Sequence, residues 1–223
     1  MSTTDISRAP VKKRKTQERT EATKGKLLEA ALKEFADRGF DAVTVRDIEV
    51  AAGVQRGLLS YHFGDKQTLW TAAVENIVHE YREYRRVRSE VVKDLSEHEQ
   101  LAFRIRAFVR FSAKRPELNR LMMQEGKRDN PRLRYIIDNF LRESRPELRK
   151  LVQSDLSLTD EEFIHWYYMY LGGSALVFSL APEAKQLFDI DVTDEDFITR
   201  HAQFVANFLT GGFPASKQAA NDQ

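Results

Sequence analysis

The chain has 223 residues, and its 35 Lys and Arg residues nearly balance its 34 Asp and Glu residues, which leaves a formal net charge of +1. This length suits one large or two small domains, whose core removes roughly 70% of the unfolded chain's surface from water. Cysteine is absent, which excludes disulfides, thiolate metal sites and cysteine nucleophiles and fits a reducing cytosol. No apolar run approaches the roughly 20 residues of a membrane span, and the N-terminus is polar, so we expect a cytoplasmic protein with no membrane contact.

The N-terminal segment carries a local positive charge that the net charge of the whole chain does not reveal. Positions 8–26 contain eight basic and two acidic residues, a local net charge of +6, and include Lys12, Lys13, Arg14 and Lys15. Residues 1–16 lack apolar periodicity, which predicts a disordered basic arm. Such a run is equally typical of a solvated tail, but beside a DNA-binding motif it suits the neutralisation of phosphates.

A helix is predicted over residues 18–38, because apolar residues recur on one face and Gly39 can end it. The next segment, 44–66, reads TVRDIEVAAGVQRGLLSYHFGDK. Thr44 is a good N-cap with Asp47 as its capping-box partner, and Val43 and Ile48 occupy the hydrophobic-staple positions. Gly53 can adopt the left-handed conformation that ends this short helix.

A second short helix is predicted from about Gln55, with Leu58 or Leu59 buried and the polar side chains turned outward. Asp65 then caps a third helix, which runs from Lys66 to about Arg88. Two helices joined by a tight turn, the second presenting amide, guanidinium, hydroxyl and phenol groups, are typical of a helix-turn-helix that enters the major groove.

These residues resemble the N-terminal domain of TetR-family transcriptional repressors. The matching segments are EFADRGFDAVTV (34–45), RDIEVAAGV (46–54) and LSYHFGDKQTLW (59–70), so the resemblance covers about residues 20–75. Two positions depart from the usual pattern, because Leu58 stands where many relatives have Thr and Ser60 where many have Tyr.

Geometry and resemblance together imply the DNA contacts. Gln55 and Arg56 are the candidates for base recognition, since Gln pairs bidentately with adenine and Arg with guanine. The remaining candidates are expected at the backbone or in close approach to it: Thr44, Arg46, Gly57, Ser60, Tyr61, His62, Lys66 and the arm residues Lys12, Lys13, Arg14 and Lys15. Packing within the motif is the alternative for Tyr61 and His62, and it is the interpretation we adopt for Phe63.

The remaining chain predicts further helices, each with a recognisable start. Ser96 with Glu99 and Thr159 with Glu162 form capping boxes, Pro116 and Asn130-Pro131 open two helices, and Thr193 caps the last, which ends at Gly211-Gly212. Pro146 is expected to kink or break its helix. The segment 163–181 is apolar on most faces and is therefore expected to be buried on both sides.

The predicted fold is all-α. It consists of the arm (1–16), a three-helix helix-turn-helix DNA-binding domain (17–66), a larger helical ligand-binding and dimerisation domain (67–212) and a tail (213–223). The resemblance implies a homodimer that places one motif in each of two successive major grooves. Its interface is expected at Tyr170, Gly173, Ser174, Val177, Phe204 and Phe208, with packing inside one chain as the alternative.

The family architecture also implies a pocket for a small effector. Candidate lining residues are aromatic or Met, which suit ligand pockets but equally form ordinary core: Tyr81, Phe103, Phe108, Phe111, Met122, Met123, Tyr135, Phe140, Trp166 and Met169. Arg104, Arg106, Arg110 or Arg142 is a possible carboxylate partner for an acidic ligand.

Catalytic and metal motifs are missing from the sequence. The five histidines occur singly, and there is no P-loop, GxSxG, GxGxxG or HExxH pattern, so we expect no enzyme, no cofactor and no metal. The expected function is a DNA-binding transcriptional regulator, a repressor released from a palindromic operator in double-stranded DNA by a small apolar, aromatic or acidic effector. The alternative is a DNA-organising or accessory factor without an effector.

Overall fold

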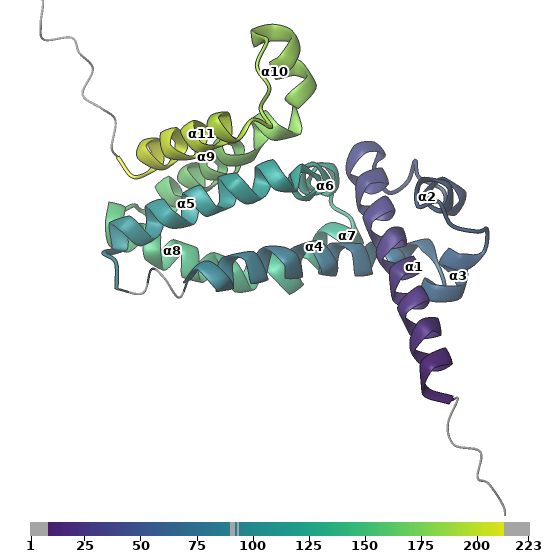
Figure 1. Ribbon diagram of the computed structural model, residues 1–223. Helices are drawn as coiled ribbons and strands as arrows, with labels where there is room; N and C mark the ends of the chain where they lie inside the picture. Colours follow the sequence, from purple (N-terminus) through teal and green to yellow (C-terminus); the bar gives the residue numbers. More distant parts are fainter. Residues whose placement is uncertain (1–8, 90–91, 93, 212–223) are drawn as a thin grey trace, which may run out of the picture. The chain divides into compact units, whose positions relative to one another are not determined.

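A computed structural model describes residues 9–89, 92 and 94–211, and Figure 1 draws the helices that they form. The predicted all-α class is confirmed, because these residues form helices and connecting turns without a strand. The chain divides into two compact units, Met1–Asn76 and Ile77–Gln223. No helix within the described ranges is long and apolar enough to cross a membrane.

The first unit contains α1 (Ala9–Arg38), α2 (Val45–Ala51), α3 (Leu58–Phe63) and the first part of α4 (Lys66–Ser89). α1 packs on α2, and α2 packs on α3. The buried core residues come from all four helices and include Leu27, Leu32, Phe35, Ile48, Leu59, Leu69 and Trp70. The boundary at Asn76 lies ten residues beyond the predicted one at 66, because the first turns of α4 supply buried side chains to this core.

α1 begins at Ala9 and not near Glu18. The part of the predicted disordered arm that the structure describes, residues 9–16, is therefore helical. Pro10 suits a first helical turn, and the Lys, Arg and Gln residues after it are good helix formers. Residues 1–8 of the predicted arm and the predicted tail (213–223) lie outside the described residues.

The second unit contains the rest of α4 and a bundle built around α5 and α9. α5 packs against α8, α9 and α11, and α9 also contacts α6, α8, α10 and α11. The bounds are α5 (Glu97–Lys114), α6 (Pro116–Gly126), α7 (Pro131–Ile136), the π-helix η2 (Ile137–Leu141), α8 (Arg142–Leu156), α9 (Asp160–Ser179), α10 (Ala181–Phe188) and α11 (Glu195–Leu209). Trp166 stacks on Tyr170 in the core, with its indole nitrogen donating to the Leu209 carbonyl at 2.9 Å.

Most predicted helix starts are confirmed. Ser96 and Thr159 cap α5 and α9 through their capping boxes, and Asn130 caps α7. The predicted cap at Thr193 is wrong by one residue, because the Asp194 carboxylate accepts from the Asp196 amide at 2.9 Å while Thr193 bonds to the Asp191 carboxylate.

Two further features differ from the prediction. Pro146 lies inside α8 without ending it, and the irregularity falls just upstream, where η2 widens the helix before Arg142. The separate helix α10 was not predicted, and it follows directly on α9 with Pro182 in its first turn.

Candidate nucleic-acid interface

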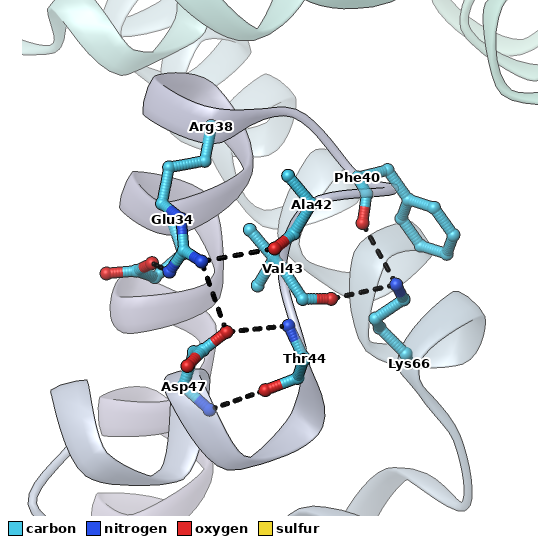
Figure 2. A network of polar contacts seen from close by, with 8 residues as sticks. All are labelled: Glu34, Arg38, Phe40, Ala42, Val43, Thr44, Asp47 and Lys66. Atoms are coloured by element: carbon cyan, nitrogen blue, oxygen red, sulfur yellow. Dashed lines mark hydrogen bonds and ion pairs between the residues drawn. The ribbon is translucent and has the colours of Figure 1, made fainter.

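The entrance to the helix-turn-helix is held by a polar network, drawn in Figure 2. The Thr44 hydroxyl accepts from the Asp47 amide at 3.1 Å, and the Asp47 carboxylate accepts from the Thr44 amide at 2.9 Å, which confirms the predicted capping box. Hydrogen bonds from the Thr44 backbone lower the pKa of the Asp47 carboxyl, with Arg38 as a further cause. The Arg38 guanidinium also bonds to Glu34 and to the Ala42 carbonyl, so α1, the connecting segment and α2 share one network.

Lys66 holds the same segment from the other side. Its ammonium donates to the carbonyls of Phe40 at 2.9 Å and Val43 at 2.8 Å, and it lies 4.2 Å from the centre of the Phe40 ring (Figure 2). An ammonium has three N–H donors, so one remains for another partner. Lys66 therefore has a structural role that the sequence did not indicate, and its contact with DNA stays a prediction.

Glu49 connects the two helices of the motif. Its carboxylate is 2% exposed, and one of its oxygens accepts from the Gly57 amide at 2.7 Å and from the Leu59 amide at 3.3 Å. A buried charge without such partners would be strongly unfavourable, so the start of α3 is held where both amides reach one oxygen. Glu49 was not identified from the sequence. The only available signal was an acidic residue at an otherwise apolar position of α2.

The predicted start of the second helix at Gln55 is wrong, because α3 begins at Leu58. Gly57 has φ +89°, in the left-handed region that an α-helix interior excludes, so Gln55 and Arg56 precede the helix in a turn closed by the Leu58 amide on the Gln55 carbonyl. Gly53, with φ +62°, ends α2 as predicted.

The candidate contact residues lie on the exposed side of this motif. A surface hollow of about 390 Å³ is lined by Val45, Arg46, Glu49, Arg56, Gly57 and Ser60. Four of the predicted DNA contacts therefore surround one open depression. Thr44 and Gln55 are also exposed, and the Tyr61 ring is 80% exposed beside His62, at 4.9 Å between ring centres. Phe63 is partly buried, in keeping with a packing role.

The arm residues Lys12, Lys13, Arg14 and Lys15 lie in the N-terminal part of α1. Their contact with DNA stays a prediction.

The ten predicted pocket residues are spread over the second unit. Phe108, Phe111 and Trp166 are buried core, whereas Met123 and Met169 are about half exposed on the surface. Tyr81 packs edge-on to Phe108 in that core. The others are partly buried: Phe103, Met122, Tyr135 and Phe140. Phe103 lines a hollow of about 220 Å³, whose other residues the apolar pattern did not indicate: Arg85, Val92, Gln100, Arg104, Ala107, Glu147 and Leu151.

The predicted dimer residues face different directions. Tyr170 and Ser174 point into the core of their own unit, so their assignment to a dimer interface is corrected. Val177 and Phe208 are partly buried against that core, Gly173 is exposed, and the Phe204 ring is 66% exposed. The exposed face of α9 instead carries residues spaced by four: Ile164, Tyr168, Gly172, Leu176 and, at its end, Leu180.

Comparisons with known proteins agree with this geometry. Residues 27–73 match the family described as bacterial regulatory proteins, tetR family. The chain is 46% identical over 46 residues to the HTH-type transcriptional repressor AcnR of Corynebacterium glutamicum, covering 21% of this chain and 24% of AcnR. It is 40% identical over 77 residues to the HTH-type transcriptional regulator CymR of Pseudomonas putida, covering 34% of this chain and 38% of CymR. The matched segments thus span well under half the length of these relatives.

The fold likeness extends further along the chain. A crystal structure of a TetR-like transcriptional regulator from Rhodococcus sp. RHA1 superimposes with a TM-score of 0.60 at 18% identity, covering 84% of this chain and 93% of that one. Coverage of 84% of this chain means that the fold likeness includes much of the second unit.

Replacing the buried carboxylate tests how α3 is held. Glu49→Ala leaves the Gly57 and Leu59 amides unpaired and is expected to weaken the local stability of α3 by about 2–4 kcal/mol. Glu49→Gln keeps a carbonyl oxygen that accepts both bonds and is expected to lose less. Hydrogen exchange of residues 57–63 measures this, with the exposed Val50→Ala on the same helix as the control. Equal exchange in Glu49→Ala and wild type would contradict the assignment.

Two glycines offer a matched pair of substitutions. Gly57→Ala places a Cβ on a left-handed backbone with open space around it, so strain alone should destabilise the first unit by roughly 1–2 kcal/mol. Gly25→Ala, inside α1 and equally uncrowded, should stabilise it by roughly 0.5–1 kcal/mol. The chain has two tryptophans, so Trp70 fluorescence in a Trp166→Phe background reports unfolding of the first unit. Stability changes of the same sign in Gly57→Ala and Gly25→Ala would contradict the backbone strain assigned to position 57.

Proposed function

We propose that the chain is a TetR-family transcriptional repressor that binds a palindromic operator as a homodimer, since residues 27–73 match that family of bacterial regulatory proteins. A small ligand bound in the second unit releases it from DNA. Such a ligand acts only through different affinities for the DNA-binding and the released conformations.

The observation that carries the proposal is the exposed recognition segment. Gln55 and Arg56 stand on a turn whose two ends are fixed, at Gly53 by the end of α2 and at Gly57 by the Glu49 carboxylate. Their amide and guanidinium groups are exposed and have the chemistry that recognises adenine and guanine edges in the major groove. Arg46, Ser60 and Tyr61 surround them with groups that suit phosphate.

A homodimer follows from the need for two motifs on one palindrome. Two recognition segments in successive major grooves lie about 34–36 Å apart, which requires a two-fold partner. The exposed apolar face of α9, with Tyr168 and Leu176 at its centre, and the exposed Phe204 on α11 supply a surface for that partner. α9 and α11 pack on each other, so these residues belong to one pair of helices.

Base recognition is tested by selecting fragments of genomic DNA with the purified protein. The wild type should enrich a short palindrome, and Arg56→Ala should lose that enrichment while remaining a dimer, because one bidentate contact per half-site is worth about 1–3 kcal/mol. Arg46→Ala is the control, since loss of a phosphate contact should weaken binding to all sequences without changing the preferred one. Binding by the wild type without sequence preference would contradict the operator and favour a DNA-organising factor.

The dimer surface is tested by placing a charge at its centre. Tyr168→Glu brings two like charges together across the two-fold axis and is expected to shift the protein from dimer to monomer in analytical ultracentrifugation, with at least a tenfold loss of operator affinity, about 1.4 kcal/mol. Met123→Glu, at an exposed apolar residue of α6, should leave the dimer intact. A monomeric wild type would contradict the homodimer. A dimer that Tyr168→Glu leaves unchanged would place the interface elsewhere.

A further inference from the structure

We propose that the hollow lined by α4, α5 and α8 binds a small apolar monocarboxylate, whose carboxylate takes the place of Glu147 between Arg85 and Arg104. The inference rests on the ligand-responsive function proposed above and assigns the chemical class of the ligand. Three properties of the hollow support the inference: its charges, its lining residues and its volume.

Three charged side chains from three helices meet there. The Glu147 carboxylate of α8 lies 3.2 Å from the Arg85 guanidinium of α4 and 3.2 Å from the Arg104 guanidinium of α5. Two positive groups thus share one negative group, which leaves an excess charge of +1 at the hollow. Planar guanidinium groups recognise carboxylates through paired N–H donors, so this arrangement favours an organic acid over a neutral or cationic ligand.

The three side chains differ in how firmly they are held. Arg104 is 12% exposed and Arg85 is 25% exposed, whereas the Glu147 side chain is 65% exposed. Because the Glu147 carboxylate is open to water, it can turn into solvent while both arginines stay in place, and the largely buried Arg104 then needs a new anionic partner. Although partial burial opposes it, the guanidinium groups of Arg104 and Arg85 lower the pKa of Glu147, so the group that a ligand displaces is a carboxylate anion.

Part of the wall of the hollow is apolar, beside the three charged side chains and Gln100. Phe103, Ala107 and Leu151 line it beside the arginines, so a ligand gains from burying a hydrocarbon group as well as from its charge. The volume of about 220 Å³ lies below the roughly 300–1,000 Å³ of sites for drug-sized ligands. It therefore suits a small acid with one compact apolar group.

Among the described residues, the two phenols next to the arginines add no negative charge. Tyr81 and Tyr170 lie beside Arg85 and Arg104, and burial raises the pKa of both phenols, which keeps them neutral. The carboxylate of Glu147 is then the group that a ligand has to displace.

The exchange also changes a link between helices. Arg82 and Arg85 of α4 pair with Glu143 and Glu147 of α8, at 2.7 and 3.2 Å. A ligand that pairs with Arg85 breaks the Arg85–Glu147 ion pair and leaves the Arg82–Glu143 ion pair in place. α4 begins at Lys66, directly after the DNA-binding motif, so the helix that loses the tie is the one that continues from that motif.

The test is a titration of the full-length protein with benzoate and hexanoate, and with benzyl alcohol, hexanol and hexylamine as probes of similar skeleton without the negative charge. We expect at least one of the two acids to bind and to raise the melting temperature, and the alcohols and the amine to bind at least tenfold more weakly. Glu147→Gln removes the internal competitor and should tighten the acid about tenfold or more, whereas Arg104→Met should weaken it by a similar factor. Glu143→Gln breaks the neighbouring tie outside the hollow and should change affinity less than twofold.

Opposite effects of Glu147→Gln and Arg104→Met cannot both arise from a loss of folding. The inference is overturned if neither acid binds, if acids and alcohols bind alike, or if Glu143→Gln acts as Glu147→Gln does. DNA binding is measured on the same samples without acid by fluorescence anisotropy. Specific DNA binding without acid binding would overturn this inference alone, whereas acid binding without specific DNA binding would overturn the proposed function.

Discussion

Glu49 carries a carboxylate into the interior of the helix-turn-helix, where a charge is tolerated only if hydrogen bonds surround it. The amides of Gly57 and Leu59 meet that need at one oxygen, and they reach it only because the backbone at Gly57 is left-handed. These two hydrogen bonds tie the start of α3 to α2. Gln55 and Arg56, just before that start, are exposed, and Glu49, Arg56 and Gly57 all line the same surface depression.

The other end of the motif is fixed in a similar way by charge and not by packing alone. Arg38 at the end of α1 and Lys66 at the start of α4 both bond to carbonyls of the segment between α1 and α2. Each is a long cation that donates to carbonyl oxygens of this connecting segment, which lies outside both helices. Three helices are thus joined through one short connection, and the capped start of α2 belongs to the same network as the start of α4 (Figure 2).

What the sequence could predict follows from the distance over which each interaction acts. Caps such as Thr44 with Asp47 and Thr159 with Glu162 join residues three positions apart, so pattern alone located them. Glu49 reaches Gly57 across eight residues, and nothing in the pattern indicated that bond or the late start of α3. α9 is apolar on nearly all faces, so its sequence could not show that Tyr170 and Ser174 point inward and Tyr168 outward. The group of Arg85, Arg104 and Glu147 comes from three helices far apart in the chain, and only Arg104 had been considered as a carboxylate partner.

Gln55 and Arg56 precede α3 and contribute nothing to the buried core of their unit. Exposed substitutions away from caps and cores usually change stability by less than about 0.5 kcal/mol. These two positions can therefore accept other side chains without repacking α2, α3 or α4. If these two residues read the operator as proposed, its preferred sequence can be rewritten, by natural divergence or by design, at two positions of a turn while the scaffold that presents them stays as it is.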